Sequence, residues 1–129
     1  MGQRRSSVFT GTGSQLPTRR IKNEEFLEHE FFLDYGQPLD PSNNPRVLAK
    51  FRDITGISER RYATDDQVAS DLGAAAGASA LSDADIDPET IDYVIVAHKF
   101  GDVRADRLRL ELCPKLAARI KEKNRIHNH

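Results

Sequence analysis

A segment crowded with small side chains limits the folds open to this chain. Residues 67–81 contain eight alanines and glycines: Ala69, Gly73, Ala74, Ala75, Ala76, Gly77, Ala78 and Ala80. Asp65 and Asp66 precede the segment, and acidic residues of this kind suit the start of a helix. Each glycine costs a helix roughly 1 kcal/mol relative to alanine, a cost that packing can offset. Because small side chains let backbones approach closely, the segment predicts a helix packed between layers.

An apolar segment, residues 91–97, follows this helix after a polar turn. Its central residues, 93–96, are apolar in succession, which is the pattern of a strand covered on both faces in a parallel sheet. Residues 8–13 read as a second strand that ends in a glycine-rich bend. The order of helix, turn and strand predicts the α/β class.

Four further elements are predicted along the chain. Asn23 suits the N-cap of a helix over residues 24–32, and Gly56 suits the end of a helix over residues 46–54. Residues 57–62 are expected to be extended, and Pro114 suits the start of a short amphipathic helix. The predicted organisation is a disordered tail (residues 1–7), one partial domain (residues 8–126) and a frayed end (residues 127–129).

Composition narrows the classes of partner. The net charge is −1, so no overall field attracts nucleic acid or an anionic membrane surface. No run approaches the roughly 20 apolar residues that span a bilayer. The single cysteine, Cys113, excludes an internal disulfide and fits a reducing compartment. We therefore expect a cytoplasmic protein with neither nucleic-acid nor membrane partners.

His98 is the most conspicuous polar residue, because it follows the predicted strand 91–97 at the end where open α/β sheets place their sites. It could act as a general base or contact a ligand, or it could be a loop histidine bonded to backbone. The second interpretation is favoured, since no nucleophile is identifiable nearby. Cys113 precedes a proline that starts a helix, where a thiol pKa falls, but a packed thiol is the favoured interpretation there too.

Neither a metal nor a cofactor is predicted. Two terminal imidazoles, His127 and His129, lack further ligands for zinc. The acids of residues 83–87 lack the glycine and terminal glutamate of a calcium loop. In residues 11–16 the third glycine of a dinucleotide-binding loop would fall at Leu16, so that site is also excluded.

Five motifs occur in an informative order: residues 9–17 (FTGTGSQLP), 23–26 (NEEF), 54–61 (ITGISERR), 69–72 (ASDL) and 87–97 (DPETIDYVIVA). This series resembles the N-terminal portion of 3-oxoacyl-acyl-carrier-protein synthase III, a condensing enzyme of the thiolase superfamily. The resemblance extends over almost the whole chain. It implies the incomplete first half of a thiolase-like fold layered α/β/α/β/α.

The resemblance also implies a chemistry. Members of the family condense an acyl-CoA primer with malonyl-ACP by decarboxylative Claisen condensation, with a cysteine that carries the acyl group. That cysteine would lie about ten residues past His129 by the family's spacing, and the family's catalytic histidine and asparagine belong to the second half. No catalytic residue is therefore expected in these 129 residues, which should be inactive alone. For the parent enzyme the implied partners are acyl-CoA, acyl carrier protein and a second protomer.

Three residues are candidates for substrate binding: Cys113, His98 and Lys50. In relatives, the position of Cys113 contributes to the dimer interface and reaches the partner's acyl pocket. Lys50 and Ile54 stand where relatives hold CoA with an aromatic residue and an arginine, so that contact is not expected intact. Residues 124–126 replace the usual Leu-Gly-Ile, which suggests a truncation or frameshift. The alternative function is a non-catalytic association module, because an incomplete layered fold exposes strand edges.

Overall fold

The computed structural model describes residues 6–104 and 115–127 of the chain. By its internal contacts the chain divides into two compact units. One unit comprises residues 17–64, and the other comprises the residues before and after it. The predicted domain limits at residues 8 and 126 stay predictions.

A two-stranded antiparallel sheet begins the unit of residues 17–64. Strand β1 (Arg19–Lys22) pairs with β2 (Glu59–Tyr62), and Arg19 lies opposite Tyr62. Arg20 Nη2 and Glu59 Oε1 form an ion pair of 2.9 Å across the two strands. The prediction of extended backbone over residues 57–62 is confirmed for the residues of β2.

The helix predicted over residues 24–32 is wrong. The structure has a 3-10 turn, η1 (Asn23–Phe26), followed by two further short 3-10 turns, η2 (Asp34–Gly36) and η3 (Pro41–Asn43). Asn23 does not cap a helix, because its side chain is used in tertiary contacts: Nδ2 donates to the Ile57 carbonyl at 2.7 Å, and Oδ1 accepts from Arg60 at 2.8 Å. Tertiary hydrogen bonds thus override the local capping signal.

Helix α1 (Asn44–Thr55) confirms the predicted second helix, and Gly56 ends it in the left-handed conformation with φ of 67°. That φ suits glycine, which carries no Cβ. At the other end Asn44 is fully buried, and its Nδ2 donates to the carbonyls of Leu27 and His29. The start of α1 is thereby fastened to the loop before it.

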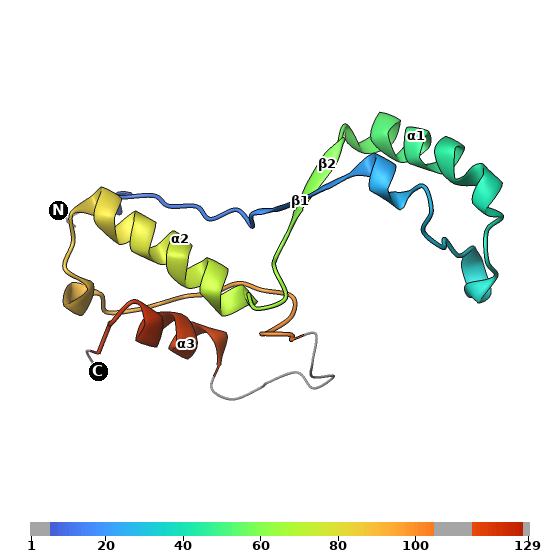
Figure 1. The fold of residues 1–129 in the computed structure, drawn as a ribbon. Coiled ribbons are helices and arrows are strands. Elements are labelled where there is room, and N and C mark those ends of the chain that lie inside the picture. The colour runs from blue at the N-terminus through green and yellow to red at the C-terminus, as the bar shows by residue number, and fades with distance from the viewer. Residues whose placement is uncertain (1–5, 105–114, 128–129) are drawn as a thin grey trace. The chain divides into compact units, whose positions relative to one another are not determined.

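The second unit is built on helix α2 (Ala69–Ala84), which confirms the predicted small-residue helix. Asp85 ends it in the left-handed conformation, and a 3-10 turn, η4 (Pro88–Thr90), follows. Helix α3 (Leu116–Lys123) lies alongside α2 (Figure 1). The buried apolar residues of the described chain come from this unit: Val68, Ala74, Leu116, Ile120 and Ile126.

The glycines of this unit explain how closely its parts approach. A Cβ on Gly13 would lie 2.2 Å from the Ala76 carbonyl oxygen of α2, and one on Gly11 would lie 2.6 Å from that of Ala80. On α2 itself, a Cβ on Gly73 would lie 2.6 Å from Ile120 Cδ1 of α3. Small residues therefore admit both α3 and the residues 11–13 backbone against α2. Packing on α2 agrees with the expectation from composition, whereas thiolase-like layering is not established.

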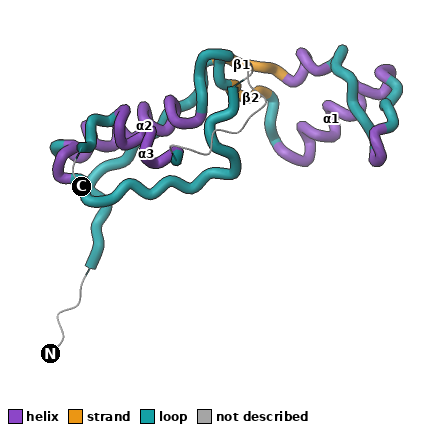
Figure 2. The backbone as a smooth tube through the Cα atoms, turned by 90° about the horizontal axis from the view of Figure 1, so that it is seen from below, coloured by secondary structure: helices purple, strands orange, loops and turns teal. Residues whose placement is uncertain are grey.

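Both strands predicted for this unit are wrong as strands. Residues 8–13 and 91–97 have no strand assignment, and Figure 2 shows strand only at β1 and β2. Tyr93 and Ile95 are 86% and 93% exposed, so residues 91–97 are not covered on both faces either. A strand requires hydrogen-bonded pairing with a neighbouring strand, and no described segment pairs with residues 8–13 or 91–97. The small sheet and three α-helices of the described chain still make it a mixed α/β protein, as predicted.

Candidate functional site

A buried polar cluster joins three parts of the second unit. Asp102 is 4% exposed, and it accepts hydrogen bonds from the Ser70 backbone N–H and the Ser70 hydroxyl, both at 2.8 Å. Arg119 Nη1 donates to the same carboxylate at 2.7 Å. Ser70 lies in the first turn of α2, Arg119 lies on α3, and Asp102 lies in the loop after residues 91–97. The Asp102 carboxylate therefore ties this loop to both helices.

The charge state of Asp102 follows from two opposed effects. Burial acts to raise the pKa of its carboxyl, because desolvation disfavours the charged form. The hydrogen bonds from Ser70 and the guanidinium of Arg119 favour the carboxylate and outweigh burial, so the pKa of Asp102 lies below its ordinary value. A carboxylate at the N-terminal turn of α2 also suits the positive end of the helix dipole.

A second carboxylate extends the cluster toward solvent. Asp71 Oδ2 accepts from the Val68 backbone N–H at 2.9 Å, and Asp71 Oδ1 pairs with Lys123 of α3. The Lys123 hydrogen bond, followed by that from Val68, lowers the pKa of Asp71. A pocket of about 220 Å³ lies against this cluster, and Arg104 and Val68 contribute to its lining.

The cluster is better suited to holding a loop in place than to catalysing a reaction. Ser70 is 1% exposed, so its hydroxyl is closed to a substrate, and its partner is a carboxylate rather than an imidazole base. Nucleophilic catalysis of the serine type needs an accessible hydroxyl within reach of a base. What the arrangement can do is hold the loop of residues 98–104 in one conformation.

His98 lies in that loop but outside the cluster. Its side chain is exposed, and no hydrogen bond or ion pair of His98 is found within the described part of the chain. Phe100 is exposed beside it. The structure thus places His98 on the surface, whereas Asp102, four residues on, is the buried group.

The other two candidate residues are not brought to His98 by any described contact. Lys50 is exposed on α1, where a groove of about 220 Å³ is lined by Leu48 and Arg52 but not by Lys50. Cys113 lies outside the described residues. Whether any of the three contacts a substrate stays a prediction.

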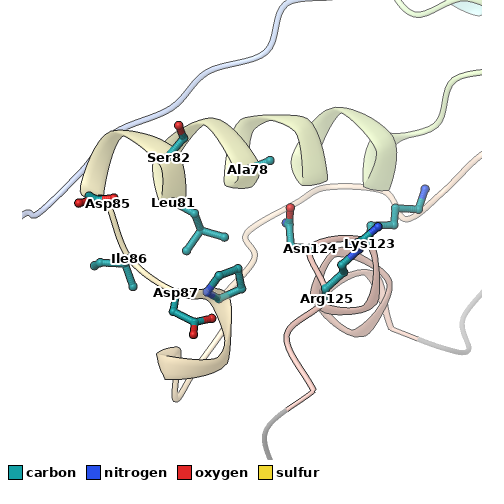
Figure 3. Close-up of a pocket in the computed structure, with 10 residues that line it drawn as sticks. Ala78, Leu81, Ser82, Asp85, Ile86, Asp87, Lys123, Asn124 and Arg125 are labelled. Carbon is teal, nitrogen blue, oxygen red and sulfur yellow. The ribbon is translucent and has the colours of Figure 1, made fainter.

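A pocket of about 570 Å³ lies where α2 and α3 both end (Figure 3). Leu81 and Ile86 supply apolar walls, while Asp87 and Arg125 bring opposite charges to its rim. Figure 3 shows Asn124 extending toward α2, where its Nδ2 would lie 2.8 Å from a Cβ on Gly77. None of the residues that line this pocket is as deeply buried as Asp102.

Within residues 6–104 and 115–127, no group of three or more His, Cys, Asp or Glu side chains is placed to hold a metal ion. Over the same residues, none of the helices combines the length and the apolar character that crossing a bilayer requires.

Sequence reasoning missed the partners of Asp102. One signal was present: Arg119 lies between Leu116 and Ile120 on the apolar stripe of α3. A cation on a buried stripe needs a carboxylate partner, because an unpaired buried charge is costly. The identity of the carboxylate that pairs with Arg119 depends on the path of the loop that carries Asp102, and no local sequence pattern predicts that path.

Comparison with known proteins shows which of them the chain resembles in sequence. No model of a known protein family matches it. Over 93 residues, 72% of its length, it is 40% identical to beta-ketoacyl-[acyl-carrier-protein] synthase III of Staphylococcus aureus strains JH1, Mu3 and Newman. The chain spans about a quarter of the length of these relatives, since the match covers 25% of each. The resemblance predicted from the motif order, to a portion of beta-ketoacyl-acyl-carrier-protein synthase III, is therefore confirmed by sequence similarity.

Proposed function

We propose that these residues form the opening part of a condensing acyltransferase of fatty-acid biosynthesis. The whole enzyme would join an acyl-CoA primer to malonyl-ACP by decarboxylative Claisen condensation. The observation that supports this most strongly is the 40% identity over 93 residues to synthase III. The proposed partners of the whole enzyme are acyl-CoA, acyl carrier protein and a second protomer, and its proposed location is the cytoplasm.

In this proposal the described residues supply scaffold rather than the reactive group. Asp102 fixes the loop of residues 98–104 to the N-terminal turn of α2 and to Arg119 of α3. His98, Cys113 and Lys50 are the proposed substrate contacts, and the acyl-carrying cysteine is proposed to lie outside these residues.

A chimera tests the proposal. The segment of the S. aureus JH1 enzyme that matches this chain is replaced by the corresponding residues of this chain, and condensation of acyl-CoA with malonyl-ACP is measured. Activity within about tenfold of the parent enzyme is expected, a loss of about 1.4 kcal/mol in transition-state stabilisation. A folded chimera with no condensing activity would overturn the proposal.

The inactivity of the 129 residues alone is tested separately. The purified chain is incubated with radiolabelled acyl-CoA beside a Cys113→Ser variant. No stable labelling of either protein is expected. Labelling that the Cys113→Ser change abolishes would identify a nucleophile in this chain and contradict that part of the proposal.

A second candidate function is association without catalysis. It is favoured by residues 92–97, which pair with no strand among the described residues, while Tyr93 and Ile95 are exposed. An exposed apolar segment with unpaired backbone can act as a template for another chain. Light scattering distinguishes the two candidates, since a clean monomer argues against association and leaves the condensation proposal intact.

A further inference from the structure

Residues 17–64 form an inserted unit, because in sequence they lie between the two parts of the unit that contains α2. The side-chain hydrogen bonds of Arg20, Asn23 and Asn44 all end on residues of the inserted unit itself. The hydrogen bonds of Asp102 likewise end within the unit of α2. These polar contacts therefore stabilise each unit from within.

The two units differ in what they bury. In the inserted unit the buried side chains are two amides, those of Asn23 and Asn44, whereas the buried apolar side chains of the described chain belong to the unit of α2. Burial of apolar surface is the dominant favourable term in folding, and a hydrogen bond contributes little net stability. The inserted unit should therefore be the less stable of the two.

We infer that the inserted unit unfolds and refolds as one cooperative segment while α2 and α3 stay folded, and that Asn44 is the residue that holds this unit closed. Sub-global opening of this kind is expected where one part of a protein buries little apolar surface. The inference concerns conformation and does not depend on the proposed condensation reaction.

Asn44 fastens α1 to the loop before it. Its side chain is fully buried at the start of the helix, and Nδ2 donates to the Leu27 and His29 carbonyl oxygens at 2.8 and 2.9 Å. That loop contains short 3-10 turns in place of a longer helix. Loss of the two Asn44 hydrogen bonds would therefore free the loop from α1.

The same region has features that keep the folded state of the inserted unit shallow. Asn44 Oδ1 is buried and accepts no hydrogen bond from the described residues, and a buried acceptor without a partner destabilises a fold. On α1, Phe51 and Ile54 are 46% and 70% exposed, so their burial adds little. The inserted unit is thus held mainly by polar contacts.

The ribbon of β1 and β2 sets the limits of the opening unit. The chain enters it at Arg19 and leaves it at Tyr62, and these two residues lie opposite each other. The ion pair of Arg20 and Glu59 lies at the surface, where such pairs contribute little to stability. Because a two-stranded ribbon is by itself marginally stable in water, it does not prevent opening of the unit.

Native-state hydrogen exchange of the full chain, followed by mass spectrometry of peptides, is the first test. Amides 48–55 of α1 are expected to have protection factors at least about tenfold lower than amides 73–84 of α2, because each protection factor reports the free energy of its own opening. Equal protection of the two helices would indicate global unfolding only and would overturn the inference. A complete lack of protection in α1 would also overturn it, because the inserted unit would then not be folded.

Asn44→Ala tests the part assigned to Asn44. It removes both hydrogen bonds and should lower the protection of amides 48–55 by about tenfold or more, while amides 73–84 stay within about twofold of the parent chain. Asn43→Ala is the matched control, because it makes the same change one position earlier, where the side chain forms no capping hydrogen bond. It should change neither helix by more than about threefold.

Two results with these variants overturn the inference. One is an Asn44→Ala chain in which α2 loses as much protection as α1, and the other is an Asn43→Ala chain that matches Asn44→Ala in its effect on α1. An Asn44→Ala chain in which α1 loses all protection while α2 keeps its own supports the inference. None of these results bears on the activity of the chimera, so the two proposals fail separately.

Discussion

Asp102 and Ser70 are joined by two hydrogen bonds of 2.8 Å, one from the Ser70 backbone N–H and one from its hydroxyl, each to a different carboxylate oxygen. The pair lies 32 positions apart in sequence. Since Arg119 completes the contact from α3, one carboxylate sets the relative positions of a loop and two helices.

Asp102→Ala should strongly destabilise the unit that contains α2. It removes the partner of Arg119, whose side chain is 14% exposed, and leaves the Ser70 donors unpaired. Breaking a buried pair of this kind costs about 3 kcal/mol. Urea denaturation measures the loss in the free energy of unfolding. Asp53→Ala, on an exposed position of α1, is the control and should change it by less than about 0.5 kcal/mol. Equal effects of the two changes would contradict the structural role of Asp102.

Stability should fall in acid because of Asp102 and Asp71. Both carboxyls have a pKa below the ordinary value in the folded chain. For Asp102, burial raises the pKa, but the hydrogen bonds from Ser70 and the guanidinium of Arg119 together lower it by more. For Asp71, the hydrogen bond from Lys123 is the main cause of the lowered pKa. Unfolded aspartate has a pKa of about 3.9, so the stabilisation is present above about pH 4 and is lost as pH falls through the folded-state values. Urea midpoints measured between pH 7 and pH 3 check the direction. Asp102→Asn should show a shallower decline, and an identical decline would exclude Asp102 as a source.

Gly13→Ala should displace residues 11–13 from α2. The added Cβ would lie 2.2 Å from the Ala76 carbonyl oxygen and 2.5 Å from the Ala80 nitrogen, and backbone atoms of a helix cannot move aside cheaply. We expect a loss of about 2 kcal/mol in the free energy of unfolding, typical of overpacking. Ser14→Ala, at an exposed neighbouring position, is the control. Faster amide exchange in residues 76–84 of Gly13→Ala would report the displacement directly.

Gly73→Ala and Ile120→Val should be coupled. Alanine favours the helix by about 1 kcal/mol over glycine, but its Cβ would lie 2.6 Å from Ile120 Cδ1. Ile120→Val removes that methyl group and costs about 1 kcal/mol alone. The double variant should be more stable than the sum of the single effects by about 1 kcal/mol, as expected for residues in contact. A double-mutant cycle in urea measures the coupling, and strict additivity would show that the two side chains do not meet.

Local signals predicted the elements whose causes are local. Gly56 ends α1 because it adopts a positive φ, and the small residues of α2 allow the close approach of Gly13 and of α3. The N-cap signal at Asn23 failed, because that side chain bonds to Ile57 and Arg60, more than thirty positions away. His98 drew attention through its chemistry, yet Asp102 is the residue that the fold buries.

The sequence by itself determined the α/β class, the two principal helices and the resemblance to synthase III, because helix periodicity, caps and motif order are properties of neighbouring residues. Only the tertiary structure decided that residues 8–13 and 91–97 are not strands. A strand needs a partner, and the apolar pattern of residues 91–97 specifies a readiness to pair without specifying what pairs with it. The Asp102 cluster was decided in the same way, since a buried carboxylate is stable only where the fold brings Ser70 and Arg119 to it.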